Sequence, residues 1–329
     1  MNKSLLIPLT CFCASAALPA QAATWTGGAG NSDWFTAGNW NSAAVPTSAN
    51  DAINDSMSGI VISGGTANDA TGYIGAFVNN SGVATVDGSG TVWANAVAAK
   101  IGNSGTGTLT IQNGALVTAP ISYLGLAANS SGTATITGTG SAWNSTSGFY
   151  VGNSGNGTLT IQNGGTASDV TGAIANAGSS LGTATITGAG SAWTSSGNFF
   201  VGNAGNGNLV IQNGGSVSDA TGYIGSIVTS TSMATVTGAG STWSQSGKIS
   251  VGNSGSATLK ILNGGQVSAA NAYLGENAGS SGTAIIDGSG SSWNNSGGVY
   301  VGKTGTGILT LSNGGTSSSS NSNSSAKSV

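Results

Sequence analysis

Apolar and polar residues alternate with a period of two in short segments along most of the chain. The segment 158–161 reads T-L-T-I, and the segment 183–186 reads T-A-T-I. Neighbouring side chains of a β-strand point to opposite faces, so the apolar residues of each segment share one face and the threonines share the other. The segments end in Gly or Asn-Gly, which close strands and interrupt helices. The pattern therefore predicts many short strands and no regular helix.

These strand segments belong to a unit of 50 residues that recurs without insertion. Trp193 has counterparts 50 residues away on both sides, and so do the pairs Val151-Gly152 and Asn163-Gly164. Each unit contains two similar halves of about 25 residues. One half is too short to bury its own apolar face, but it can do so when it is stacked on its neighbours. Such a rigid spacing indicates that every copy occupies an equivalent place along an axis.

We therefore predict an all-β fold, a parallel β-helix (solenoid) of about eleven turns built from 50-residue double-turn repeats. At a strand spacing of about 4.8 Å, the rod would be roughly 50 Å long. Its interior would hold one column in which Leu and Ala alternate: Leu109, Ala134, Leu159, Ala184, Leu209, Ala234, Leu259, Ala284 and Leu309. Beside it would lie a second aliphatic column: Ile111, Ile136, Ile161, Ile186, Ile211, Val236, Ile261, Ile286 and Leu311.

Both ends of the chain depart from the repeat. Residues 1–22 have the features of a secretory signal peptide: Lys3, an apolar run and an A-x-A cleavage site. The final stretch 316–329 is rich in Ser and Asn, and we expect it to be a disordered tail because it cannot bury a core. The β-helix repeat domain is expected at 58–315.

Residues 23–57 are predicted to form a Trp-rich N-terminal cap. They contain Trp25, Trp34 and Trp40 among Gly, Asn and Asp. The first turn of a solenoid presents unpaired backbone groups, and a cap covers them. A sugar-binding platform is the alternative interpretation of these three tryptophans.

Charged residues are scarce, and this excludes several classes of function. The chain has six Lys and Arg, nine Asp and Glu, and no His, for a formal net charge of −3. Nucleic-acid binding depends on basic surfaces, so we expect no nucleic-acid partner. Histidine chemistry is absent, and the two cysteines, Cys11 and Cys13, lie in the expected signal peptide. We therefore expect no enzyme activity, no catalytic residue, no cofactor and no metal site.

Carboxylates are the remaining candidates for catalysis, because β-helix enzymes that degrade polysaccharides need at least two of them close together. Asp69, Asp169 and Asp219 share one phase of the repeat, but Ala119 and Ala269 interrupt their series. We interpret these aspartates as hydrogen-bond acceptors for turn backbone. A polysaccharide-degrading or polysaccharide-binding β-helix remains the alternative to a non-catalytic role.

Two constellations are candidates for surface contacts. The first is a column of tryptophans, one on every second turn: Trp93, Trp143, Trp193, Trp243 and Trp293. We interpret this column as packing at a corner of the solenoid, because the flanking glycine turns leave room for a ring. If it pointed outward, it would form a ladder for contact with a glycan or a protein partner.

The second constellation is an array of threonines in neighbouring turns: Thr108, Thr110, Thr133, Thr135, Thr158, Thr160, Thr183 and Thr185. Two files of hydroxyl groups on a flat sheet resemble the faces of ice-binding solenoids. The files are broken further on by Asn208, Val210, Met233 and Lys260. Threonine is also an ordinary residue on the solvent face of a strand, which is the interpretation that we favour.

The repeat also resembles a known class. The unit I-G-N-x-G-x-G-T-L-T-I-x-N-G-G, followed by S-S-G-T-A-T-I-T-G-A-G-S-x-W, is similar to repeats of autotransporter (type V secretion) passengers and of some PEP-CTERM surface proteins. The opening W-T-G-G and D-W-F-T-A-G-N-W at 25–40 is similar to the N-terminal module of such proteins. The resemblance implies a right-handed parallel β-helix at the surface of a Gram-negative-type bacterium, or released from it, for adhesion or aggregation.

We therefore expect a non-catalytic exported protein that acts by contact, as an adhesin, in aggregation or in a biofilm. Its expected location is the cell surface, the outer membrane or the extracellular space, or the periplasm for a truncated passenger. The expected partners are surface glycans, surface proteins or further copies of the chain. We expect no membrane span within the chain, and an outer-membrane translocator that is separate from it.

Overall fold

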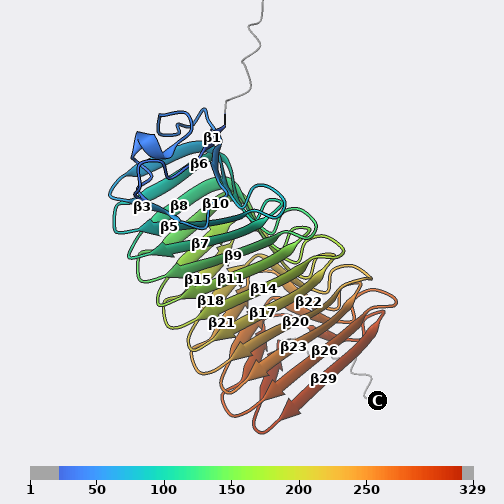
Figure 1. Ribbon diagram of the computed structural model, residues 1–329. Coiled ribbons are helices and arrows are strands. Elements are labelled where there is room, and N and C mark those ends of the chain that lie inside the picture. Colours follow the sequence, from blue (N-terminus) through green and yellow to red (C-terminus); the bar gives the residue numbers. More distant parts are fainter. Residues whose placement is uncertain (1–21, 321–329) are drawn as a thin grey trace, which may run out of the picture.

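The computed structural model describes residues 22–320, and in this range the chain is a parallel β-solenoid (Figure 1). The expected signal peptide lies almost entirely outside the described residues. Strands of successive turns pair in parallel and in register, for example Thr158 with Thr183 and Thr160 with Thr185. The predicted parallel β-helix is confirmed, and the cap adds one short 3-10 turn, η1 (Ala37–Asn39).

Three faces enclose the core, and the chain visits them in the same order in every turn. The first face is an eleven-stranded sheet, which agrees with the predicted turn count. Its strands are β3 (Ile60–Ser63), β5 (Ser81–Asp87), β7 (Thr106–Gln112), β9 (Ser131–Thr137), β11 (Asn156–Gln162), β14 (Leu181–Thr187), β17 (Asn206–Gln212), β20 (Thr231–Thr237), β23 (Ser256–Leu262), β26 (Ser281–Asp287) and β29 (Thr306–Ser312).

The second and third faces belong to one sheet that bends at a corner. Four long strands cover both faces: β4 (Thr66–Ile74), β6 (Val92–Ile101), β8 (Leu116–Leu124) and β10 (Ala142–Val151). Later strands of the second face are β12 (Thr166–Asp169), β15 (Ala192–Ser195), β18 (Ser216–Asp219), β21 (Thr242–Gln245), β24 (Gln266–Ala269), β27 (Ser292–Asn295) and β30 (Thr316–Ser319). The third face also has β1 (Ala23–Thr24), β2 (Ala52–Asn54), β13 (Thr171–Ile174), β16 (Asn198–Val201), β19 (Thr221–Ile224), β22 (Lys248–Val251), β25 (Asn271–Leu274) and β28 (Val299–Val301).

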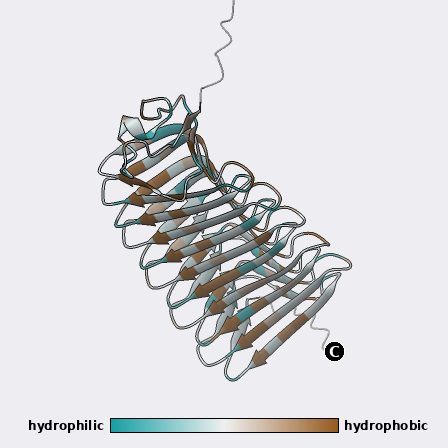
Figure 2. Cartoon of the chain, viewed as in Figure 1, coloured by the Kyte–Doolittle hydropathy of each residue, from teal (hydrophilic) through white to brown (hydrophobic). Residues whose placement is uncertain are grey.

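The two aliphatic columns lie inside the solenoid, as the alternation predicts, except in the last turn, where Leu309 is only partly buried and Leu311 is 45% exposed because no later first-face strand of the described chain covers them. Leu159, Ala184 and Leu209 follow one another in register and are fully buried, and Ile161 and Ile186 form the column beside them. Figure 2 shows hydrophobic segments of successive first-face strands one above another along the rod. Alternating Leu with Ala keeps a narrow interior filled without overpacking.

Backbone conformation explains why two dipeptides recur in every unit. Gly152 has φ of 77° at the corner that leads to the first face, and a Cβ on it would lie 2.4 Å from the carbonyl oxygen of Leu181. Asn163 and Gly164 close the first-face strand with φ of 54° and 83°. Asn and Gly are the residues that adopt positive φ at the lowest cost.

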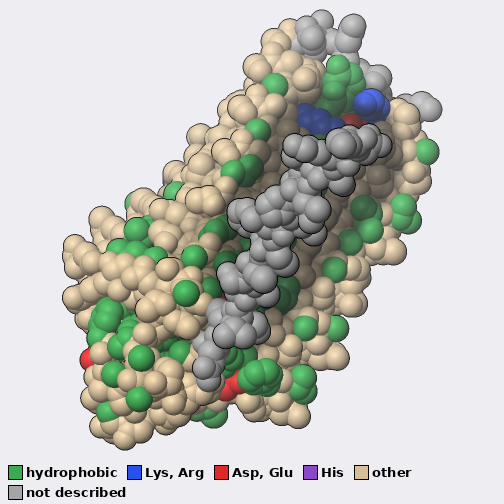
Figure 3. Space-filling model, turned by 90° about the horizontal axis from the view of Figure 1, so that it is seen from above, with side chains coloured by type: hydrophobic (Ala, Val, Ile, Leu, Met, Phe, Trp, Pro, Cys, Tyr) green, Lys and Arg blue, Asp and Glu red, His purple; other side chains and the backbone are tan. Residues whose placement is uncertain are grey.

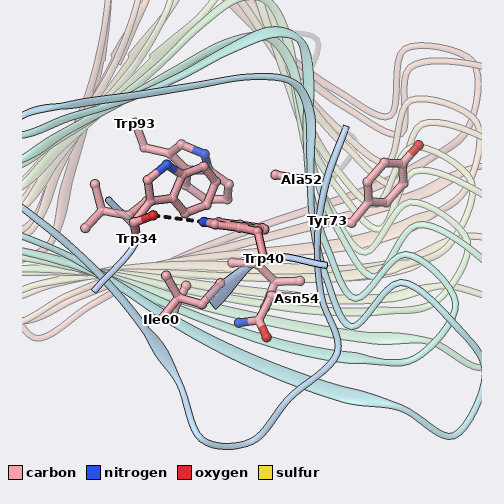
Figure 4. Close-up of a pocket in the computed structure, with 10 residues that line it drawn as sticks. Trp34, Trp40, Ala52, Asn54, Ile60, Tyr73 and Trp93 are labelled. Atoms are coloured by element: carbon pink, nitrogen blue, oxygen red, sulfur yellow. Dashed lines mark hydrogen bonds between the residues drawn. The ribbon is translucent and has the colours of Figure 1, made fainter. Parts of the chain in front are cut away.

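The N-terminal tryptophans pack on the first turns. Trp34 and Trp40 meet edge to face with ring centroids 4.7 Å apart, and Trp34 lies 6.2 Å from Trp93 of the repeat. The indole N–H of Trp40 donates to the carbonyl oxygen of Trp34 at 2.9 Å (Figure 4). The cavity left among these rings measures only ≈ 10 Å³, about enough for one water molecule.

This packing supports the capping interpretation, since Trp25, Trp34 and Trp40 are all at least 95% buried and offer no ring to a sugar. The cap is also part of the solenoid. Its strand β2 pairs with β1 on one side and with β4 on the other, so the third face begins before residue 58.

The prediction of a disordered tail from residue 316 onward is wrong for its first residues. Thr316–Ser319 form β30, which pairs in parallel with β27. Backbone pairing with the preceding turn orders this segment although its side chains bury no core. The remainder of the expected tail, residues 321–329, lies outside the described residues.

The buried tryptophans should contribute strongly to stability. We expect Trp193→Ala to lower the free energy of unfolding by about 3–5 kcal/mol, because it leaves a large cavity in the core. Urea unfolding followed by circular dichroism measures this change. The exposed Thr158→Ala on the first face is the control and should alter stability by no more than about 0.5 kcal/mol. Similar effects of both substitutions would contradict the assignment of Trp193 to the core.

Candidate binding surfaces

The tryptophan column lies in the interior, so the exposed-ladder alternative is wrong and the packing interpretation is confirmed. All five rings, those of Trp93, Trp143, Trp193, Trp243 and Trp293, are at least 98% buried. Phe149 lies between the rings of Trp143 and Trp193, and Phe199 lies between those of Trp193 and Trp243, with centroid distances of 4.7 to 6.1 Å. Small residues precede and follow each ring in register, such as Ala167 before Trp193 and Val217 after it. Neither glycans nor partners can reach this column.

Each aspartate of the Asp69 series accepts a hydrogen bond from one of these indoles. Trp93, Trp193 and Trp243 donate their Nε1–H groups to Asp69, Asp169 and Asp219 respectively, each at 2.6 Å. The interpretation of these carboxylates as acceptors for turn backbone is therefore wrong. Each aspartate lies two residues after the position that is in register with the tryptophan of the next turn, so both side chains point inward. A buried indole N–H needs an acceptor, and the carboxylate provides it.

In turns that lack the aspartate, the indole N–H either donates to another side chain or has no acceptor among the described residues. Ala119 replaces Asp in one turn, and there the Trp143 indole donates to the Ser122 hydroxyl at 2.9 Å. Ala269 replaces it in another, and the Trp293 N–H has no hydrogen-bond partner in the described part of the chain. The interrupted aspartate series thus reflects how each indole is satisfied and does not form a catalytic pair.

Burial changes the protonation of these carboxyl groups. It raises the pKa of Asp169 to about 6 and that of Asp219 to about 7, against the opposing effect of the indole hydrogen bonds. The charge of Asp169 raises the pKa of Asp219 further. Burial also raises the pKa of Asp69 well above its ordinary value. A buried carboxyl without a cation nearby is more stable in its neutral form.

A pH dependence of stability follows from these shifts. Between the ordinary pKa of 3.8 and the raised values, the folded chain binds more protons than the unfolded chain. The free energy of unfolding should therefore fall as the pH rises from about 4 to about 7, by ~3 kcal/mol for Asp169 alone. The double variant Asp169→Asn/Asp219→Asn should flatten this decline in urea titrations at several pH values.

Asp287→Asn serves as the matched control for that experiment. Hydrogen bonds from Ser312 and Asn313 lower the pKa of Asp287, so its stabilising effect is lost only at pH values below its ordinary pKa. The control should keep the decline between pH 4 and pH 7. A profile that is equally steep in the double variant would contradict the burial effect.

The eight threonines lie on the outer side of the first face. Thr108, Thr133, Thr158 and Thr183 form one file across β7, β9, β11 and β14, and the second set forms the file beside it. Asn208 and Met233 continue the first file, and Val210 and Lys260 stand in the second, where the sequence indicated breaks. We call the outer side of this eleven-stranded sheet the hydroxyl face.

The structure reveals a second outward file that sequence reasoning missed. One column of the third face contains seven aromatic residues, which we call the aromatic file: Tyr73, Tyr123, Tyr150, Phe200, Tyr223, Tyr273 and Tyr300. Rings in adjacent turns stack with centroids 4.8 to 5.3 Å apart and planes within 16° of parallel. All seven side chains are partly exposed.

A small cluster of charges accompanies the aromatic file near its C-terminal end. The Lys248 ammonium lies 5.3 Å from the Tyr223 ring centroid and 5.4 Å from that of Tyr273. It also pairs with both carboxylate oxygens of Glu276 at 2.8 and 2.9 Å. Burial alone would raise the pKa of Glu276, but hydrogen bonds and the charge of Lys248 lower it overall.

Comparisons with known proteins identify no relative of this chain. No family model matches it, and neither a curated protein nor a solved structure matches it at a level that indicates kinship. Within residues 22–320, no helix is long and apolar enough to cross a membrane. In the same range, no three His, Cys, Asp or Glu side chains lie close enough together to hold a metal ion.

Proposed function

We propose that this protein is a non-catalytic, exported contact protein that mediates adhesion or aggregation through its repetitive outer surfaces. The observation that carries the proposal is the hydroxyl face. Eleven strands in register present mainly Thr, Ser, Asn and Gln side chains outward, with Asp87, Lys260 and Asp287 as the charged residues of this surface. Apolar side chains also occur on it: Val61, Val83, Leu181, Val210, Met233, Leu262, Ile285 and Ile308.

Such a face suits contact between like surfaces. Each strand repeats the donor and acceptor groups of its neighbour at about 4.8 Å, so a matching surface can make many weak contacts at once. Charge repulsion between copies is small, because charged residues make up only 5% of the chain. The view in Figure 3 also shows few charged side chains among many uncharged ones.

The proposed place of action rests on the sequence. The signal-like segment 1–22 and the resemblance of the repeat to autotransporter passengers support export to the cell surface or beyond it. Surface glycans, surface proteins or further copies of the chain are the proposed partners.

Polysaccharide binding is the second candidate, and the aromatic file is the observation that favours it. Tyrosines combine an apolar ring with a hydroxyl group and are common in contact surfaces. The buried Trp column and its buried aspartates give no support to polysaccharide degradation, since substrate cannot reach them.

Surface display on a non-adherent bacterial strain tests the proposal. We expect the unmodified chain to cause settling and attachment. The triple variant Thr110→Lys/Thr160→Lys/Val210→Lys should reduce both, because it places repelling charges on every second turn of the hydroxyl face. Lys260 already occupies the next equivalent position, so lysine fits there.

A matched control carries the same charge on another face. Thr118→Lys/Ser168→Lys/Ser218→Lys lies on the outer side of the second face, in the same order of turns. Settling should survive in this control. Absence of settling by the unmodified chain, or equal loss in both variants, would contradict a contact role for the hydroxyl face.

A further inference from the structure

The loops between the third and first faces lie one after another along one edge of the solenoid, where the first-face strands begin (Figure 1). Long and short loops alternate from turn to turn. The long loop 75–80 follows β4, and the long loop 125–130 follows β8. The short loop 102–105 between them is recessed. The result is a cleft of ≈ 270 Å³ between the two long loops.

The walls of this cleft are held by backbone hydrogen bonds. The amide of Gly105 donates to the carbonyl of Gly75 at 3.2 Å, and the amide of Ala127 donates to the carbonyl of Asn103 at 2.9 Å. The amide N–H of Asn80 donates to the carbonyl oxygen of Phe77 at 3.1 Å, across the tip of loop 75–80. The cleft is therefore largely pre-formed, which lowers the entropic cost of binding.

Polar side chains that have no hydrogen-bond partner among the described residues line the cleft. Asn79 and Asn129 flank it from equivalent places in the two long loops, with φ of 66° and 65°. Neither amide makes a side-chain hydrogen bond within the described chain, and the hydroxyls of Ser81 and Thr106 make none either. Two amides and two hydroxyls are thus free to bind a ligand with many hydroxyl groups.

An apolar rim adjoins these polar groups. Val78 lines the cleft and is 68% exposed, and its neighbour Phe77 is 58% exposed at the loop tip. Together they place an apolar surface beside the polar groups of the cleft. No lining residue is charged, so the cleft offers nothing to an anion or a cation.

We propose that this cleft binds a neutral sugar residue of a glycan chain. Amide and hydroxyl groups would pair with the sugar hydroxyls, while Phe77 and Val78 would cover its C–H face. An extended peptide is disfavoured, because peptides dock on open sheet edges or in long apolar grooves, and this cleft is neither. The site borders the hydroxyl face, because Ser81 and Thr106 are the first residues of β5 and β7, and the inference rests on the proposed contact with surface glycans, which it makes more specific.

The other long loops along this edge of the solenoid provide an internal comparison. The positions of Phe77 and Val78 hold Ala127-Ala128, Ala177-Gly178 and Asn277-Ala278 in three of them. Only the loop 225–230 has large apolar residues there, Ile227 and Val228, and Thr229 replaces the asparagine. The combination of an aromatic tip with two free asparagines is therefore specific to the cleft near the cap.

Calorimetric titration of the full chain tests this proposal. The probes are neutral hexasaccharides of β-1,4-glucan, α-1,4-glucan, β-1,4-mannan and β-1,4-N-acetylglucosamine, with hexagalacturonate as the acidic comparison. We expect at least one neutral probe to bind and the acidic one to bind more weakly. Asn79→Gly/Asn129→Gly should weaken binding about tenfold, because it removes two hydrogen-bonding amides. Glycine keeps the positive φ at both positions, so the loops should fold as before.

Phe77→Ala gives a second variant that leaves both amides in place, and it should weaken the same interaction. The matched control is Ile227→Ala/Thr229→Gly in the equivalent loop, which should bind the probe as the unmodified chain does. Failure of all neutral probes to bind, tighter binding of the acidic probe, or unchanged affinity in both cleft variants would overturn the proposal. The titration uses no cells, so its outcome is separate from that of the settling assay.

Discussion

The structure depends on backbone hydrogen bonds between strands of successive turns, because they set every turn directly above the one before. A parallel ladder requires the strands of each turn to keep their register with the strands of the turn before. One residue inserted in a first-face strand would move every later apolar side chain from the core to the solvent. This constraint explains why the 50-residue unit recurs without insertion from the first full copy to the last. Variation is confined to positions where the ladder tolerates it.

The same ladder governs the composition of the interior. Side chains at equivalent positions lie at the strand spacing, and in two columns of the interior a large residue has a smaller one above and below it. Leu159 lies between Ala134 and Ala184, and Trp193 lies between Ala167 and Val217. A 50-residue period arises because two turns, one with the large residue and one with the small one, are needed to fill the core. The buried aspartates belong to this packing as acceptors for the indole N–H groups.

Outside the core, the ladder turns each strand position into a column of equivalent groups on the surface. Threonines build the hydroxyl face in this way, and tyrosines build the aromatic file. The tips of the corner loops lie outside the backbone pairing between turns, so they are free to differ in sequence from turn to turn. The cleft between loops 75–80 and 125–130 arises from that freedom, whereas the faces beside it are bound to repeat.

The sequence by itself determined the fold class, the number of turns and the two aliphatic columns, because period-two alternation and a fixed repeat length leave few other arrangements. It could not decide which way Trp193 points. Its neighbours Ala192, Thr194 and Ser195 are all small, so no contrast between apolar and polar positions marks the inner side. In the structure, Trp193 is in register with the buried residues Ala167 and Val217 and points inward with them. The aromatic file was also hidden, because Tyr123 and Tyr150 are 27 residues apart and meet only through the register of β8 with β10. Which side chains become neighbours depends on where the chain turns each corner, and backbone geometry in three dimensions decides that.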